Sequence, residues 1–191
     1  GCWSTAKSRS KTRMSRVFWP AKRFRSNYQG AFMNTHELIA FDELEKQGFS
    51  VFFPRQDRGT DCVVTTKKLG RKFVPIQIKG SKKHGSGGAW FVIYKTKIDE
   101  SPEQIWLFVW PEVNQKGEFE TLFLLIEAQE LSKRIDAVSK IGKGNRVDLY
   151  FTKVGEKTIQ TRGLNQLNKA ETARDFSRFI GNWKLIAKRL S

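Results

Sequence analysis

Two apolar runs in the second half of the chain constrain the fold most. Residues 105–110 read IWLFVW and residues 120–128 read ETLFLLIEA, with the turn-like segment QKGE between them. Neither run approaches the ~20 apolar residues that a membrane-spanning helix needs. Their length and their aromatic and branched side chains are typical of strands. They therefore predict two neighbouring buried strands joined by a turn.

Other elements lie on both sides of this pair. Residues 35–47, THELIAFDELEKQ, place Leu38, Phe41 and Leu44 at helical spacing, and Gly48 ends the helix. Further strands are predicted at 49–54, 61–66, 73–80, 90–94 and 146–152, a short helix at 129–140 and a long C-terminal helix at 163–190. Helices and strands mixed in this order predict an α/β domain.

The charge of the chain favours a polyanionic partner. The 191 residues include 35 Lys and Arg against 19 Asp and Glu, which gives a net charge of +16. Basic side chains gain free energy when they displace counterions from phosphates, so nucleic acid is the expected partner, with a solvated basic surface as the alternative. Eight of the basic residues and no acid lie in residues 1–36. We therefore predict a flexible basic arm over residues 1–28 and one domain over residues 29–191.

Several classes of protein do not fit the sequence. Cys2 and Cys62 form neither a disulfide framework nor a metal cluster, and His36 and His84 have no partner at zinc-ligand spacing. No membrane span, no apolar signal core and no helix-turn-helix pattern is evident. We therefore expect a cytoplasmic protein that makes no contact with a membrane and has no device for reading DNA sequence.

The strand predicted at residues 73–80, FVPIQIKG, carries polar residues on one face. Side chains alternate across a strand, so Gln77 and Lys79 point away from the face that carries Ile78. A hairpin between this strand and the preceding one brings Asp61 opposite residues 77–79. One carboxylate, one amide and one ammonium group should therefore lie within a few ångströms of each other.

This combination suits phosphodiester hydrolysis. Mg²⁺ prefers oxygen ligands, which the Asp61 carboxylate, the Gln77 side chain and the Ile78 carbonyl can supply, and Mn²⁺ can substitute for it. Lys79 can hold the attacking water and offset negative charge on the phosphate. A cross-strand salt bridge between Asp61 and Lys79 is the alternative interpretation. Glu37 is a further candidate ligand, and a capping box with Asn34 is the alternative for it.

The stretch ELIAFDELEKQGFSVFFPRQDRGTDCVV, followed by FVPIQIKG, resembles the PD-(D/E)xK nuclease superfamily, in particular archaeal Holliday-junction resolvases and Mrr-type restriction enzymes. Glu37 matches the helix glutamate of that family, Asp61 its metal-binding aspartate, and Gln77 with Lys79 its last motif, in which an acid usually stands at the first position. The resemblance implies a restriction-endonuclease-like αβββαβ core with a mixed central sheet flanked by helices, dependence on magnesium and cleavage of DNA. The crossover helix that the family places after the third strand is not evident between residues 84 and 104.

Basic residues flank the candidate site in the sequence. Lys82, Lys83 and His84 open a glycine-rich loop after the strand, and Arg55 and Arg58 precede Asp61. All five could contact phosphates of double-stranded or branched DNA, although a solvated loop is the simpler alternative for any one of them.

These observations predict a magnesium-dependent endodeoxyribonuclease. It would be structure-selective like a resolvase or of a restriction or repair type, and relatives of the resolvase type are often homodimers, since two cuts need two sites. A catalytically inactive DNA-binding protein of the same fold is the main alternative, and a basic RNA scaffold is a weaker one.

Overall fold

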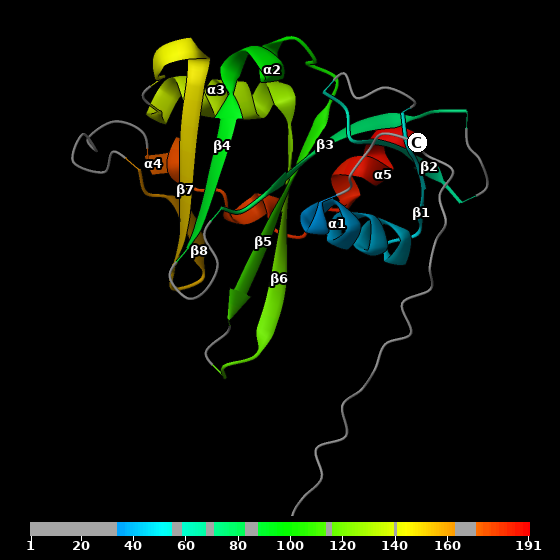
Figure 1. Ribbon diagram of the computed structural model, residues 1–191, viewed down its shortest axis with the longest axis horizontal. Helices are drawn as coiled ribbons and strands as arrows, with labels where there is room; N and C mark the ends of the chain where they lie inside the picture. Colours follow the sequence, from blue (N-terminus) through cyan, green and yellow to red (C-terminus); the bar gives the residue numbers. More distant parts are fainter. Residues whose placement is uncertain are drawn as a thin grey trace, which may run out of the picture. The chain divides into compact units, whose positions relative to one another are not determined.

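A computed structural model describes residues 34–54, 59–67, 71–82, 88–113, 116–139, 141–162 and 171–191 (Figure 1). The basic arm predicted over residues 1–28 lies outside these residues. The helices are α1 (Thr35–Lys46), α2 (Lys95–Asp99), α3 (Ala128–Val138), α4 (Glu171–Arg174) and α5 (Lys184–Leu190), with short 3₁₀ turns at η1 (Lys143–Asn145) and η3 (Ser177–Phe179). The strands are β1 (Phe49–Phe52), β2 (Cys62–Thr66), β3 (Val74–Gly80), β4 (Ala89–Tyr94), β5 (Ile105–Val113), β6 (Phe119–Glu127), β7 (Arg146–Val154) and β8 (Lys157–Gln160). None of the helices in the described residues is long and apolar enough to span a membrane.

Five strands form a mixed central sheet in the order β1-β2-β3-β5-β6. The strands β1, β2 and β3 are antiparallel neighbours, β3 runs parallel to β5, and β5 is antiparallel to β6. The predicted pairing of the two apolar runs is thus confirmed, as is the hairpin of β2 and β3. The chain is an α/β protein, as its pattern of elements predicts, and its central sheet is mixed, as the resemblance implies.

A second sheet holds β4, β7 and β8 in the order β4-β7-β8. The strand predicted at residues 90–94 is present, but it pairs with β7 rather than with the central sheet. The connection between the parallel strands β3 and β5 therefore runs through β4 and the five-residue helix α2 (Figure 1). Parallel neighbours always need such a crossover, and here it includes a strand of the other sheet.

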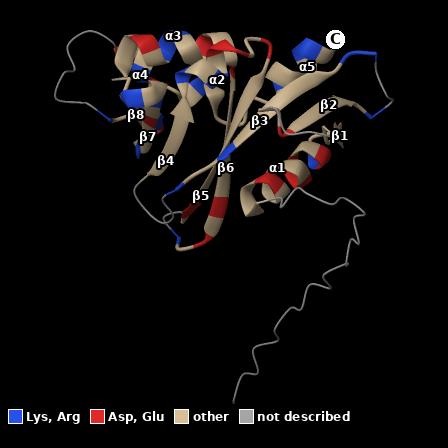
Figure 2. Cartoon of the chain, turned by 45° about the horizontal axis from the view of Figure 1, so that its top comes forward, with Lys and Arg blue, Asp and Glu red and all other residues tan. Residues whose placement is uncertain are grey.

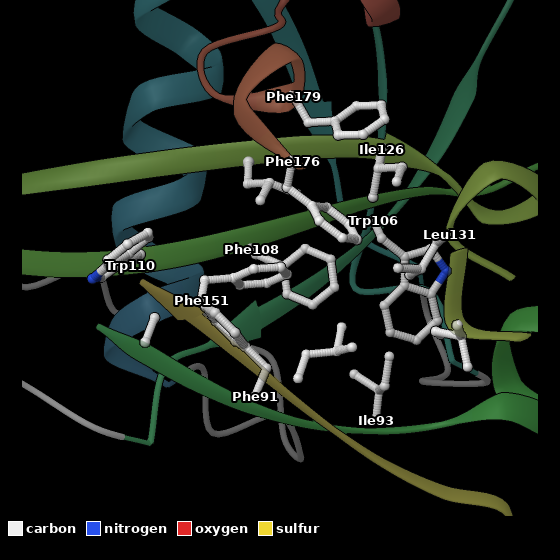
Figure 3. Close-up of a cluster of buried hydrophobic side chains, with 14 of the residues drawn as sticks. Phe91, Ile93, Trp106, Phe108, Trp110, Ile126, Leu131, Phe151, Phe176 and Phe179 are labelled. Atoms are coloured by element: carbon white, nitrogen blue, oxygen red, sulfur yellow. The ribbon is translucent and has the colours of Figure 1, made fainter. Parts of the chain in front are cut away.

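The two faces of the central sheet bury separate cores, and β5 contributes to both. Alternate residues Trp106, Phe108 and Trp110 pack with the second sheet and with α2 and α3 (Figure 3). The residues between them, such as Leu107, pack with α1 and with Ile186 of α5 on the opposite face. A strand covered on both faces reads as an unbroken apolar run, which explains the sequence IWLFVW.

The first helix is capped at both ends as the sequence predicts. Asn34 is its N-cap, and the chain leaves it at Gly48, whose φ of 93° favours glycine. Phe41 and Leu44 are buried, with Ala40 beside them. Leu38, the remaining residue at this helical spacing, is 52% exposed, so the apolar stripe is only partly buried.

The single long helix predicted at residues 163–190 is also wrong for the part described. Residues 163–170 lie outside the described part, and the remainder is divided among α4, η3 and α5. Asp175 and Ile180 form isolated β-bridges with Ile159 and Leu124, and Gly181 has a φ of 61°; both features are incompatible with a continuous helix. Tertiary contacts with both sheets therefore override the helical spacing of the apolar residues. The strand β8 just before this region was not predicted.

Candidate functional site

The Asp61 carboxylate lies where β2 separates from β3. The two strands pair from Val64↔Val74 to Cys62↔Ile76, and β3 then continues without β2 beside it. Asp61 takes the place of the missing partner: its Oδ2 accepts hydrogen bonds from the Ile78 N–H and from Gln77 Nε2, both at 2.5 Å. The structure thus brings together the acid and the amide that the sequence places at this end of the hairpin.

The backbone of Ile78 faces the side of β3 where β2 is no longer paired with it. In a strand, the N–H and the C=O of one residue point to the same side. Because the Ile78 N–H reaches Asp61, its carbonyl also faces the side that β2 has left. A carboxylate and a backbone carbonyl therefore line one edge of β3, with the Gln77 side chain beside them.

A buried glutamine that sequence reasoning missed holds the turn before Asp61. Gln104 is 1% exposed, and its Nε2 donates to the carbonyl of Gly59 at 2.7 Å and to Thr60 Oγ1 at 2.6 Å. Gly59 has a φ of 89°, and a Cβ there would come within 3.9 Å of Gln77 Oε1. Gln104 therefore ties the start of β5 to the turn that delivers Asp61. Its position directly before a buried apolar strand was the only signal in the sequence.

Gln77 and Lys79 share the face of the sheet that carries Trp106, as the alternation predicts. Gln77 is paired with Trp106 in the parallel register and is 6% exposed. The Lys79 Nζ lies 5.9 Å from the centroid of the Trp106 ring, a cation–π contact that restrains the ammonium group. Within the described residues Lys79 forms no ion pair, so the alternative of an Asp61–Lys79 salt bridge is not found.

Glu37 forms the capping box that was its alternative role. The Glu37 N–H donates to Asn34 Oδ1 at 3.0 Å, and the Asn34 N–H donates to Glu37 Oε2 at 3.1 Å. The Asn34 side-chain amide donates to the other carboxylate oxygen. Both oxygens of Glu37 therefore stabilise the start of α1, and its role as a metal ligand stays a prediction.

The start of α1 nevertheless lies beside the end of β3. A Cβ on Gly80 would come within 2.2 Å of the His36 ring, so the ring packs directly on the backbone next to Lys79. Only glycine permits this approach. Glu37, one residue further along α1, is thereby held near the same end of β3.

The pKa of the buried Cys62 thiol is affected by the carboxylates of both Asp61 and Glu37. Burial raises this pKa most, and the negative charges of Asp61 and Glu37 raise it further. Cys62 is fully buried at the start of β2. Both acids therefore lie close enough to Cys62 for their charges to act on its thiol.

Of the predicted phosphate contacts, only Lys82 can be placed. Its side chain is exposed, and its N–H donates to the Trp90 carbonyl at 2.7 Å, where the chain passes from β3 toward the second sheet. Lys82 therefore lies three residues beyond Lys79, at the same end of β3. Arg55, Arg58, Lys83 and His84 lie outside the described residues.

The ligand set for a metal is sparse. In the part of the chain that the structure describes, no cluster of three or more His, Cys, Asp or Glu side chains could hold a metal. The predicted Mg²⁺ site instead has one carboxylate, one side-chain amide and one backbone carbonyl, all of them hard oxygen donors. Gln77 turns its NH₂ group, not its oxygen, toward Asp61.

Comparison of the chain with models of protein families and with curated proteins produced no match. The candidate site therefore rests on its own geometry and on the sequence motif.

Proposed function

We propose that this protein is a magnesium-dependent endonuclease that hydrolyses phosphodiester bonds of DNA. One observation carries the proposal: the Asp61 carboxylate lies 2.5 Å from the side chain of Gln77, on an edge of β3 that β2 leaves open, with Lys79 two residues further on. The chain order is α1, β1, β2, β3, β4, α2 and β5. Apart from β4, which pairs in the second sheet, this order and the parallel pairing of β3 with β5 support a restriction-endonuclease-like αβββαβ core.

The site residues divide the chemistry among them. Asp61 and the Ile78 carbonyl would hold Mg²⁺, and Gln77 would join them after its amide rotates to exchange nitrogen and oxygen. When bound, Mg²⁺ offsets the charge that develops on the phosphate and makes a bound water more acidic. The Lys79 ammonium, restrained over Trp106, adds positive charge at the phosphate and orients the attacking water.

The proposed partner is DNA, double-stranded or branched. The excess of 35 basic over 19 acidic residues supports binding to the phosphate backbone, which carries no sequence information. We propose structure-selective cleavage of the resolvase type or cleavage of a restriction or repair type. A homodimer would supply the two active sites that two cuts need.

A second candidate function is DNA binding without cleavage. It is favoured by the donation of a hydrogen bond from Gln77 to Asp61, which occupies the carboxylate with a structural contact. A neutral amide also binds Mg²⁺ more weakly than the carboxylate usual at this position of the motif. The protein would then have the fold and the basic surface of a nuclease but would not cleave DNA.

A cleavage assay with metal and chelator arms separates the two functions. Linear and four-way branched DNA are incubated with the purified chain and Mg²⁺ or Mn²⁺, or with a chelator. We expect metal-dependent strand cutting that the chelator stops. Binding to both DNAs without cutting in either metal would favour the DNA-binding protein.

The variant Gln77→Glu tests the metal site through stability as well as activity. Without metal it replaces a hydrogen bond to Asp61 by a contact between two carboxylates, so we expect the free energy of unfolding to fall by about 1.5–3 kcal/mol. Mg²⁺ should recover much of this loss, because it binds the folded form more tightly when both ligands are charged. Thermal unfolding with and without Mg²⁺ measures both effects. The matched control is Gln47→Glu, which also replaces an amide that donates to a carboxylate, Glu43, but at an exposed position on α1 where the response to Mg²⁺ should be much smaller. Equal responses of the two variants to Mg²⁺ would count against a metal site at Asp61.

A further inference from the structure

The face of the central sheet that carries Gln77 and Lys79 continues across β2 and β1. Phe52 of β1 is paired with Val63, and Val63 with Pro75 of β3. Directly paired residues share a face, and Pro75 lies two residues before Gln77, so all of these side chains point to one side. The candidate site and the face of the β1–β3 region thus belong to one surface.

Two phenylalanines stand exposed on this surface. Phe52 is 41% exposed and Phe73, just before β3, is 54% exposed. Their ring centroids lie 6.3 Å apart at an interplanar angle of 78°, so they form one contiguous aromatic patch, the phenylalanine platform. Farther along the same face, Trp106 of β5 is only 1% exposed because the second sheet covers it.

The surroundings of the platform are basic. Lys67, Arg71 and Lys72 are exposed at the tip of the β2–β3 hairpin, where Figure 2 shows Lys and Arg on both sides of the turn. In residues 49–54, 59–67 and 71–82, Asp61 is the sole acidic residue. Two copies of this chain that met platform to platform would bring the same positive charges together and repel each other. A polyanion with aromatic groups complements both features.

The platform lies within reach of the candidate site. Phe73 lies just before β3 and four residues from Gln77, and an extended chain of that length spans about 13 Å. A nucleic acid strand with a phosphate at Asp61 can therefore place a base a few nucleotides away over Phe52 and Phe73. Paired bases inside a duplex are stacked on each other and cannot offer a face to these rings, whereas unpaired bases can.

We propose that the phenylalanine platform stacks on unpaired bases, so that the chain prefers nucleic acids with a single-stranded segment beside the cut. This inference rests on the proposed nuclease function, and it names the substrate class: flaps, forks and open junctions rather than continuous duplex. The basic residues at the hairpin tip hold the backbone of the single strand, and the rings hold its bases.

Binding measured without metal tests the platform separately from cleavage. Fluorescence anisotropy in chelator compares a single-stranded oligonucleotide, a forked duplex and a blunt duplex. We expect Phe52→Ala and Phe73→Ala each to weaken binding to the first two by about 5- to 100-fold and to change duplex binding by less than about 3-fold. Phe119→Ala is the matched control, since Phe119 is 90% exposed at the start of β6 and should bind all three like the parent.

Two conservative variants distinguish a loss of base stacking from a loss of the folded structure. Phe52→Leu and Phe73→Leu retain an apolar side chain but lose the aromatic face, so they should fold and still lose affinity for single strands. A base analogue whose fluorescence is quenched by stacking should be quenched by the parent and not by these variants.

Unchanged affinity of the leucine variants for single strands would overturn the proposal. An equal loss of affinity for all three DNAs would also overturn the proposal, because the rings would then act through the fold or through contacts with phosphates. A parent dimer that the leucine variants dissociate would assign the platform to a contact between copies. Failure of the parent to cut DNA would overturn the nuclease function alone, since the stacking experiment contains no metal.

Discussion

Replacing Lys79 with alanine is expected to lower the rate of DNA cleavage by about 100- to 1000-fold. The Lys79 ammonium is the basic group that β3 holds beside Gln77 and Asp61, and its position over the Trp106 ring restrains it for a role at the phosphate. Single-turnover cleavage at saturating DNA measures the chemical step directly. DNA binding in chelator should change only a few-fold, because one lysine among many contributes little to total binding.

The matched control for this experiment is Lys157→Ala. Lys157 is an exposed lysine on β8 in the second sheet, so its loss removes one positive charge without touching the site. Its cleavage rate should equal that of the parent within a factor of about two. If Lys79→Ala cuts as fast as Lys157→Ala, then Lys79 has no part in the chemistry and the assignment of the motif is wrong.

Replacing Phe176 with alanine should have the largest effect on stability, a loss of about 3–5 kcal/mol in the free energy of unfolding. Phe176 is fully buried between the two sheets, 4.8 Å from the Phe151 ring and 5.7 Å from the Phe179 ring, measured between centroids (Figure 3). The Arg134 guanidinium lies 5.0 Å from the same ring and donates to the Asp175 carbonyl at 2.7 Å. The truncation therefore opens a cavity and loosens the segment that Arg134 holds.

Chemical denaturation with a two-state fit measures this loss, and Phe119→Ala is again the control. Phe119 is 90% exposed, so its truncation removes almost no buried area and should change stability by less than about 0.5 kcal/mol. Similar midpoints for the two variants would contradict the position of Phe176 in the core.

Sequence patterns predicted those features of the central sheet that depend on a few neighbouring residues. The alternation in VPIQIKG places Gln77 and Lys79 on one face, and the structure has them there, opposite Ile76 and Ile78. The short turn between β2 and β3 made the hairpin predictable, and with it the approach of Asp61 to Gln77. Period-two alternation and short turns act over a few residues, so they can be read without knowledge of the rest of the fold.

Contacts between distant segments were not predictable in the same way. Gln104 holds the turn before Asp61 across 45 residues, and the pairing of β4 with β7 joins residues more than 50 positions apart. Glu37 satisfied both the capping pattern and the family motif, and only its hydrogen bonds to Asn34 showed the cap. Such pairings depend on which surfaces meet, and the local pattern does not encode that.

By itself the sequence determined the type and approximate bounds of the first helix and of most strands, and the polar face of β3, because each follows from the spacing of its apolar residues. The unbroken apolar run of β5 indicated a buried strand. Only the tertiary structure decided that the second sheet packs on one face of β5 and β6, which buries Trp106 and leaves Phe52 exposed. It also decided that residues 171–191 form three short pieces, because Phe176 is buried in one core and Ile186 in the other. No single helix can serve two cores on opposite faces of a sheet.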